Sequence, residues 1–473
     1  MVMEHGARND REPGATSDAR SGGAGRKSVR RLLAARLIGL AERVREANAR
    51  VADNPPPGPF RRGFWRSPLR GPWLTAVLGA ALLAGITLLA VTGLLSYAAY
   101  NPRFAVNDQT PDHGALGFYL FTWPTDPHWL YRLNQGVHVT LGVVLVPVLL
   151  AKLWSVLPKL FDWPPVRSIA QALERLSLLL LVGGAIFEFV TGVLNIQLYY
   201  VFPGSFYTIH FYGAWVFLGA FVVHVALKLP RMLSALRSRR LSTVLATDTA
   251  HTLPEEADPE GLVAAARPAA ATISRRGALA LTGAGSATLL VLTAGQSIGG
   301  VWRRTAFLAP RGQDPGSGPN GFQINKTARA VGVTADQIGS AWRLRLSGGP
   351  TALVLTRADL LALQQRTSAL PIACVEGWST DDQQWSGVPL AVLAAMAAVP
   401  DAAEVLVESV QREGSFRSAV LARNQLHDPR SLLALQVNGA DLSTDHGFPA
   451  RTIIPAAPGV HNTKWVAALT FRT

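Results

Sequence analysis

The chain has a single cysteine, Cys374, and the chemistry open to this residue is narrow. One cysteine excludes an intrachain disulfide and any cysteine-rich zinc or iron–sulfur site. If the surrounding domain is exported, an exposed thiol would be a liability, so we expect Cys374 to be buried, bound to a metal, or both. The residues alone also leave open a buried core cysteine and a nucleophile paired with His427, His446 or His461.

Three histidines, His138, His210 and His224, lie inside apolar stretches, where an ionisable side chain is costly and is functional by default. His138 and His210 lie at nearly the same depth of their spans, so one haem iron could bind both imidazoles. His224 follows His210 by about four helical turns, or roughly 21 Å. The residue level with His224 in the neighbouring span is Lys152, a poor haem ligand while protonated. We expect one haem b on His138 and His210, and leave His224 as the ligand of a second haem, or as a hydrogen-bonding or quinone-site residue. Glu188, also within a span, fits a proton path, a quinone site or a paired structural carboxylate.

These histidines must be positioned by membrane helices. Five stretches contain the roughly 20 apolar residues that a helix needs to cross a bilayer. Apolar and charged residues are segregated, and 49% of the chain is hydrophobic, which is typical of a membrane protein with soluble flanks. We place the spans at 73–97, 133–157, 173–196, 206–229 and 277–298.

Basic residues gather before the first span, between the second and third, and after the fourth, for example Arg61, Lys159 and Arg231. The positive-inside rule places these segments and the N-terminus in the cytoplasm. The region after the fifth span then lies outside a plasma membrane that the chain crosses several times. We assign the net charge of +14 to contacts with anionic membrane lipid. No motif for reading nucleic acid accompanies the charge, so we expect no nucleic-acid partner.

The fifth span follows Ser274, Arg275 and Arg276 and is only weakly hydrophobic, since it contains Gly283 and Ser286. This pattern resembles a twin-arginine export signal placed inside the chain. The alternative is an ordinary helix with basic flanking residues. Both interpretations place the C-terminal region outside.

The remaining residues have the composition of a soluble α+β domain dominated by short strands. The predicted division is a disordered basic cytoplasmic tail (1–70), a four-helix membrane domain (71–232), a cytoplasmic linker (233–273), the twin-arginine-like segment with the fifth helix (274–300), and an extracytoplasmic domain (310–473).

Two resemblances extend this interpretation. The first four spans are similar to the four-helix b-type cytochromes of the cytochrome b561 and hydrogenase-subunit kind. The soluble motifs, in order, are IACVEGWS at 372–379, WSGVPL at 385–390, VNG at 437–439, DHGFPAR at 445–451 and KW at 464–465. They resemble the sulfite oxidase superfamily of molybdopterin enzymes, and most closely its branch of bacterial methionine-sulfoxide reductase catalytic subunits.

This second resemblance implies a molybdenum–molybdopterin cofactor, with Cys374 as the thiolate ligand of molybdenum. It carries the other cofactor contacts onto Asn325, Thr327, Ser409, His446, Arg451, Asn462, Thr463 and Lys464. Two departures stand out. All eight tyrosines lie at or before Tyr212, whereas sulfite oxidases use a tyrosine beside the metal, which puts sulfite in doubt as the substrate. The chain also ends directly after the cofactor motif, which favours a monomeric catalytic domain.

The sequence therefore predicts an oxidoreductase in which a quinone, membrane haem and an exported molybdenum site exchange electrons. Oxygen-atom transfer on a small or protein-bound substrate follows from the resemblance, with sulfoxide-type reduction favoured. A sulfite-type dehydrogenase would use the same parts in the oxidative direction. The alternative from another class is a non-catalytic electron-transfer or anchoring protein.

Overall fold

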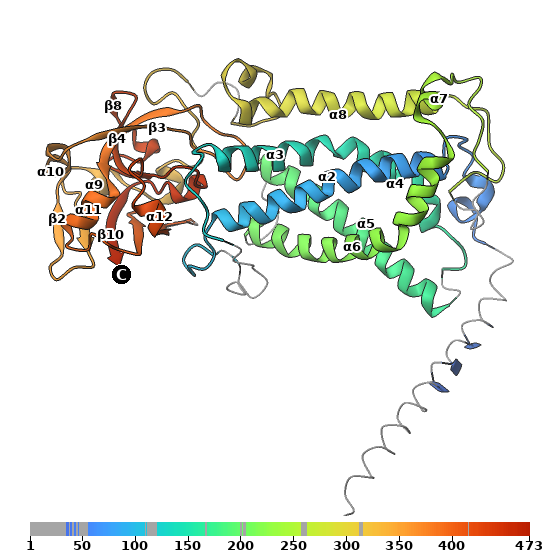
Figure 1. Cartoon of the computed structure of the whole chain (residues 1–473), viewed down its shortest axis with the longest axis horizontal. Helices are drawn as coiled ribbons and strands as arrows, with labels where there is room; N and C mark the ends of the chain where they lie inside the picture. Colours follow the sequence, from blue (N-terminus) through green and yellow to red (C-terminus); the bar gives the residue numbers. More distant parts are fainter. Residues whose placement is uncertain are drawn as a thin grey trace, which may run out of the picture.

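The computed structural model describes residues 55–108, 110, 121–165, 168–198, 201, 205–256, 263–311, 316–414 and 416–473, with a few positions between 35 and 46. A bundle of long helices and a compact strand-rich domain lie end to end, and the C-terminus belongs to the strand-rich domain (Figure 1). Most of the tail expected at 1–70 lies outside the described residues, so its disorder stays a prediction.

The bundle consists of α2 (Pro72–Ala99), α3 (Leu130–Val144), α4 (Val146–Leu160), α5 (Ile169–Ile196), α6 (Phe206–Ser238) and α8 (Arg275–Ile298). Within the described residues, five helices are long and apolar enough to span a membrane, and α3 with α4 counts as one helix of 31 residues. Pro147, near the start of α4, has no N–H for the preceding turn, which explains the interruption at Leu145. The expected four-helix bundle with a fifth apolar helix is confirmed.

The helices pack in neighbouring pairs. Helix α5 lies against α6, and α2 contacts α3, α4 and α6. Helix α8 packs along α3 and α4 at one side of the bundle (Figure 1). The shorter elements near the bundle are η1 (Gly58–Phe60), η2 (Arg62–Phe64), α7 (Leu241–Ala246) and η3 (Gly300–Thr305).

The strand-rich domain carries two sheets. Its strands are β1 (Leu344–Ser347), β2 (Leu353–Leu355), β3 (Arg366–Leu370), β4 (Gln383–Pro389), β5 (Glu404–Ser409), β6 (Ser418–Ala422), β7 (Leu432–Val437), β8 (Ala440–Asp441), β9 (Arg451–Ile453) and β10 (Val466–Arg472). Its helices are η4 (Arg329–Val331), α9 (Ala335–Ile338), α10 (Arg357–Ala362), α11 (Leu390–Met396), α12 (Arg423–Leu426), η5 (Thr444–His446) and η6 (Gly459–His461).

The first sheet has the order β2-β1-β10-β5-β6, and the second has β3-β4-β7-β8 with β9 paired to β7. Strands β1 and β10 are parallel, with Leu346 opposite Leu469, and the other pairs are antiparallel. Alternate residues of β5, Val405 and Val407, are fully buried in the core, as strand geometry requires. The predicted α+β domain of short strands is confirmed.

Polar contacts join the two parts of the molecule. The Asn107 side chain exchanges two hydrogen bonds of 2.8 Å with the backbone of Val420. Trp123 Nε1 donates to the Ala456 carbonyl at 2.7 Å. These groups are buried, so the domain is seated on the segments that connect the helices at this end of the bundle.

Candidate functional site

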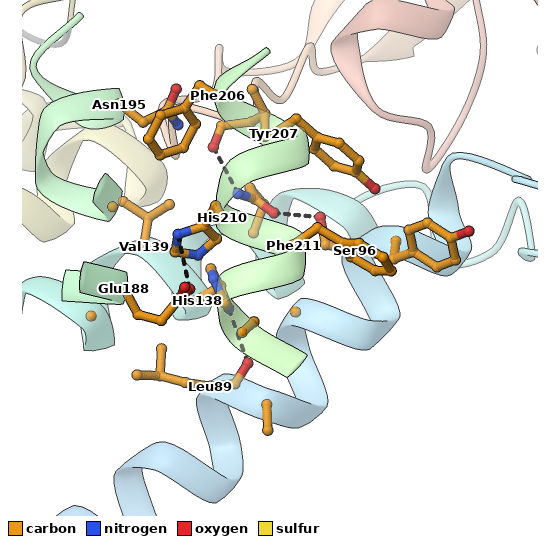
Figure 2. Close-up of a pocket in the computed structure, with 18 of the residues that line it drawn as sticks. Leu89, Ser96, His138, Val139, Glu188, Asn195, Phe206, Tyr207, His210 and Phe211 are labelled. Atoms are coloured by element: carbon orange, nitrogen blue, oxygen red, sulfur yellow. Dashed lines mark hydrogen bonds and ion pairs between the residues drawn. The ribbon is translucent and has the colours of Figure 1, made fainter. Parts of the chain in front are cut away.

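Helices α3 and α6 bring His138 and His210 together. Their ring centroids are 6.4 Å apart and the rings are nearly perpendicular, at 87°. A metal bound by two imidazoles at about 2 Å per bond holds the ring centres about 6 Å apart, so the spacing suits one metal ion between the rings. Both rings line a cavity of about 510 Å³ within the bundle, and Figure 2 shows them facing it from neighbouring elements.

Each histidine is held through its Nδ1 atom. His138 Nδ1 lies 3.1 Å from the Leu89 carbonyl and 3.0 Å from Thr92 Oγ1. His210 Nδ1 lies 3.0 Å from Thr191 Oγ1 and 3.1 Å from Glu188 Oε2 (Figure 2). A carbonyl or carboxylate partner requires an N–H at Nδ1, which leaves Nε2 of each ring as the metal-binding nitrogen.

These supporting threonines belong to a short repeat that the sequence interpretation missed. The tripeptide Val-Thr-Gly occurs at 91–93 in α2 and again at 190–192 in α5. In both copies the threonine contacts a histidine, and a Cβ on Gly93 would lie 3.2 Å from the His138 ring. The repeated tripeptide could have been found in the sequence, because each copy precedes a histidine on the next membrane span.

The sequence also singled out His224, Lys152 and Glu188 in the membrane spans, and the structure gives each a different environment. His224 is in α6 but does not line the cavity. Lys152 Nζ donates to the Thr75 carbonyl at 2.6 Å, so its nitrogen is engaged by the backbone. Glu188 is the partner of His210 and also lines the cavity, so the proton-path and quinone-site options stay predictions beside the paired carboxylate. The structure therefore brings together His138 and His210, and leaves His224 away from them.

Cys374 lies in the loop between β3 and β4, in a tight turn held by its own backbone. Its N–H donates to the Trp378 carbonyl at 2.9 Å, and its carbonyl accepts from Gly377 at 3.0 Å. Gly377 has φ +90°, and a Cβ there would lie 2.5 Å from Val139 of α3, so the turn requires glycine. Burial raises the pKa of the Cys374 thiol and nearby Glu376 raises it further, so without a metal the thiol stays protonated.

The segment 451–464 meets this loop where Gly459 N donates to the Ala373 carbonyl at 2.7 Å, and it carries two buried cations that lack a carboxylate partner among the described residues. Arg451 donates to the carbonyls of His446 and Asn462, at 2.9 and 3.1 Å. Lys464 Nζ donates to the carbonyls of Lys326 and Asp445, at 2.9 and 2.7 Å. Burial lowers the pKa of Arg451 to about 9 and that of Lys464 well below its usual range. Such a pair of buried cations calls for an anionic ligand.

Several buried polar atoms in the same segment have no hydrogen-bond partner among the described residues. They are Arg451 Nε, Asn462 Nδ2, Thr463 Oγ1 and both ring nitrogens of His461. Buried polar groups in proteins are almost always paired, so a cluster of orphan donors marks a place for a polar ligand. An anionic, hydrogen-bonding pterin with a phosphate fits this cluster.

The other expected cofactor contacts have mainly supporting partners. Ser409 Oγ donates to the Lys464 carbonyl at 2.7 Å. Thr327 is exposed and accepts from Ala330 N at 3.3 Å. His446 is buried, lies 3.8 Å from the Phe322 ring, and is hydrogen-bonded to the Asn320 carbonyl. Asn325 Oδ1 accepts from the following backbone N–H at 2.9 Å.

The proposed Cys–His nucleophile receives no support from the geometry. His427 Nε2 is hydrogen-bonded to the Ala402 carbonyl at 2.9 Å, and His446 to the Asn320 carbonyl. The His461 nitrogens have no partner in the described structure, the Cys374 sulfur included. The described residues also contain no group of three metal-binding side chains around Cys374, so a metal there would arrive with other ligands of its own.

A tyrosine from the bundle reaches this site, which the sequence interpretation missed. Tyr100, directly after α2, is buried, and its ring lies edge-on to His461 at 5.8 Å. Burial raises the pKa of Tyr100 well above its usual value, and Tyr131, Tyr207 and the Cys374 thiol raise it further. The lack of tyrosine within 310–473 therefore does not leave the Cys374 site without a phenol. No periodic pattern in the sequence predicts the contact between Tyr100 and His461.

The comparisons with known proteins agree with this geometry. Residues 331–473 match the family model of the oxidoreductase molybdopterin binding domain. The chain is 30% identical over 131 residues to an uncharacterized oxidoreductase, YuiH, of Bacillus subtilis, covering 28% of this chain and 65% of that protein. It is 28% identical over 152 residues to the mitochondrial sulfite oxidase of Drosophila melanogaster, covering 27% and 26% of the two chains.

A further relative is a putative protein-methionine-sulfoxide reductase subunit, YedZ1, of Azospira oryzae. It is 32% identical over 115 residues, which cover 24% of this chain and 42% of that protein. The matches thus span less than two thirds of each of these relatives. Residues 331–473 form a molybdopterin-binding oxidoreductase domain that is homologous to the sulfite oxidases.

Proposed function

We propose that this chain is a membrane-bound molybdenum-cofactor oxidoreductase. His138 and His210 would hold a b-type haem, which would accept electrons from a membrane quinol and supply them to the cofactor held at Cys374. The favoured reaction is reduction of a sulfoxide-type substrate, small or protein-bound, outside the cytoplasm. One sulfoxide with two electrons and two protons gives one sulfide and one water, and oxidation of one quinol to quinone supplies both electrons and two protons.

One observation carries this proposal. The cavity that His138 and His210 line is also lined by Val375, the residue that follows Cys374. A redox group in the cavity would therefore be next to the turn that holds the thiol. The bundle and the domain together supply two adjoining redox sites, which suits transfer of electrons from the membrane to an extracytoplasmic substrate.

Different residues around Cys374 would contact different parts of the cofactor. Cys374 would be the thiolate ligand of the metal, and Arg451 and Lys464 would neutralise the pterin phosphate. Asn462, Thr463 and their neighbours supply hydrogen bonds to the pterin. When bound, the cofactor supplies a metal that exchanges an oxygen atom with the substrate.

Localisation forms part of the same proposal. The domain sits at the end of the bundle where α2 finishes and α3 and α6 begin (Figure 1). The arginines near η1, η2 and the end of α6 lie at the opposite end, and the positive-inside rule makes that end cytoplasmic. The N-terminus is then cytoplasmic, the membrane domain covers 71–232, and residues 310–473 lie outside.

Purified protein tests the proposal directly. After expression in a host that makes the pterin, we expect molybdenum and one haem per chain by metal analysis and optical spectroscopy. Methionine sulfoxide should then be reduced with a quinol as donor. Protein that folds and carries haem but binds no molybdenum would instead identify a non-catalytic electron-transfer or anchoring protein.

A sulfite-type dehydrogenase that works in the oxidative direction is the second candidate. The homology of residues 331–473 to sulfite oxidases and the Tyr100 phenol beside the Cys374 site favour it. Reduction of the haem by added sulfite, without any turnover of sulfoxide, would select this direction.

A further inference from the structure

The histidine cavity and the Cys374 turn share a wall. Besides His138 and His210, the residues that line the cavity include Val375 of the turn, Gln135 of α3 and Tyr100. Gln135 precedes His138 by one turn of α3, so both side chains lie on the same face of the helix. The wall is thus made from both parts of the molecule.

Gln135 bonds the two parts across this wall. Its Nε2 donates to the Val375 carbonyl at 2.7 Å, and its Oε1 accepts from Ser96 Oγ of α2 at 2.8 Å. The side chain is buried, and its amide is engaged on both sides. Two helices of the bundle therefore fix the peptide group next to Cys374.

Tyr100 fills the neighbouring part of the wall. Its ring lies 5.8 Å from the His461 ring on the domain side and 5.4 Å from the Tyr207 ring on the bundle side. It also lies 6.1 Å from Phe416 of the domain, which lines the cavity as well. Tyr100 is buried, so at this part of the wall its ring lies between the cavity and His461 of the domain.

We propose that Gln135 and Tyr100 form the route by which electrons cross between the histidine cavity and the Cys374 site. The transfer then occurs within one chain and needs no diffusible carrier. Both are positioning residues, since they act by joining the two sites. The inference rests on the proposed function, because it requires a redox group at each site. For each sulfoxide reduced, two electrons from one quinol cross singly, and two protons are taken up as water is released.

Rapid mixing of the full-length holoprotein tests the route. The haem is first reduced with a quinol, methionine sulfoxide is added, and haem reoxidation is followed optically. Gln135→Leu and Tyr100→Leu should each slow reoxidation at least tenfold, with haem spectrum, haem potential and molybdenum content unchanged. Tyr100→Phe keeps the ring and should restore the rate. In Gln135→Leu, reduction of methionine sulfoxide by reduced methyl viologen, a donor in solution, should stay within twofold of the parent.

Asn107→Ala is the matched control, because it removes two buried hydrogen bonds between the same parts, away from the cavity wall. Its reoxidation rate should equal that of the parent. Equal slowing in Asn107→Ala and Gln135→Leu would overturn the route, since loosened docking would then explain both. Unchanged rates in Gln135→Leu and Tyr100→Leu would also overturn it. A parent protein that lacks haem or molybdenum would contradict the proposed function instead.

Discussion

At the scale of single residues, the segment beside the Cys374 loop contains a buried positive charge with no carboxylate partner among the described residues. Arg451 is only 1% exposed, yet its guanidinium has backbone carbonyls as partners and one N–H without any. An ionised group buried in this way costs several kcal/mol unless an opposite charge joins it. In the proposed function a pterin phosphate offsets this cost, so the residues that lower the stability of the empty domain raise its affinity for the cofactor.

The first prediction concerns the thiol. Cys374→Ser should leave the fold and the bound pterin largely unchanged, because the turn is held by backbone hydrogen bonds and the phosphate contacts lie elsewhere. Turnover should fall below detection, since an alcohol is a poor ligand for the metal in its working states. Pterin content by fluorescence after release, and sulfoxide reduction with a quinol, measure the two effects. Full activity in this variant would exclude the assigned role.

The second prediction concerns acid stability. Burial lowers the pKa of His461 to about 4, from an ordinary value near 6.5. Between these values the unfolded chain takes up a proton that the folded domain does not, so stability is present above about pH 6.5 and is lost as the pH falls towards 4. From pH 7 to 4.5 the cofactor-free protein should lose on the order of 2 kcal/mol through this residue.

Unfolding of the domain can be followed through Cys374, because this buried residue is the only thiol in the chain and reacts with a label once it is exposed. Thiol labelling after heat pulses at the two pH values gives the midpoint at which the domain opens. His461→Gln should keep its midpoint more nearly constant between the two pH values than the parent. Identical pH dependence in parent and variant would show that His461 is not the group responsible.

At the scale of elements, the same tripeptide on two helices positions the two histidines of the cavity. Helices α2 and α5 each present a Val-Thr-Gly tripeptide, and their neighbours α3 and α6 each present a histidine. Thr92 and Thr191 bond carbonyls of the preceding turn, at Leu88 and Phe187, so their hydroxyls are fixed beside the imidazoles. The glycine that follows each threonine lies beside the histidine ring, since a Cβ would lie 3.2 Å from His138 at Gly93 and 3.9 Å from His210 at Gly192.

The third prediction follows from this arrangement. His138→Ala and His210→Ala should each remove the same haem, because one imidazole cannot maintain a six-coordinate iron. His224→Ala should retain that haem, since His224 lies outside the cavity. Optical spectra of the three purified variants decide the assignment. A complete bis-histidine spectrum in either of the first two, or loss of all haem in the third, would contradict it.

How well the sequence predicts these features depends on how far apart in the chain the contacting residues are. Hydropathy marked the spans to within a few residues at most ends, and the depth of His138 and His210 placed them on one level. The partners that orient them, such as Thr92, are ordinary helix residues whose role depends on which helices pack together. The contact of Tyr100 with His461 joins segments more than 300 residues apart, so no local pattern reveals it.

At the scale of the whole molecule, the start of α8 is bonded to neighbouring segments at the end of the bundle away from the strand-rich domain (Figure 1). Arg275 is 4% exposed and donates to the carbonyls of Leu253 and Pro68, at 2.8 and 2.9 Å. Its Nε lies 3.4 Å from Glu255, whose other oxygen accepts from the N–H of Trp73 at 2.9 Å. In the folded protein Arg275 thus joins α8 to the beginning of α2, whichever route the domain takes across the membrane.

The last prediction separates this structural role from export. If Ser274, Arg275 and Arg276 act as a twin-arginine signal, changing both arginines to lysine should strand the C-terminal domain inside while the first four spans insert normally. Lysine keeps the positive charge that sets orientation but loses the guanidinium contacts. Glu255→Gln is the matched control, because it weakens the buried ion pair and leaves both arginines in place. Protease digestion of intact spheroplasts should then find the domain inside in the double lysine variant and outside in Glu255→Gln. An outside domain in the lysine variant would exclude the export signal, and an inside domain in both variants would mean that the Arg275–Glu255 contact, rather than the signal, is required.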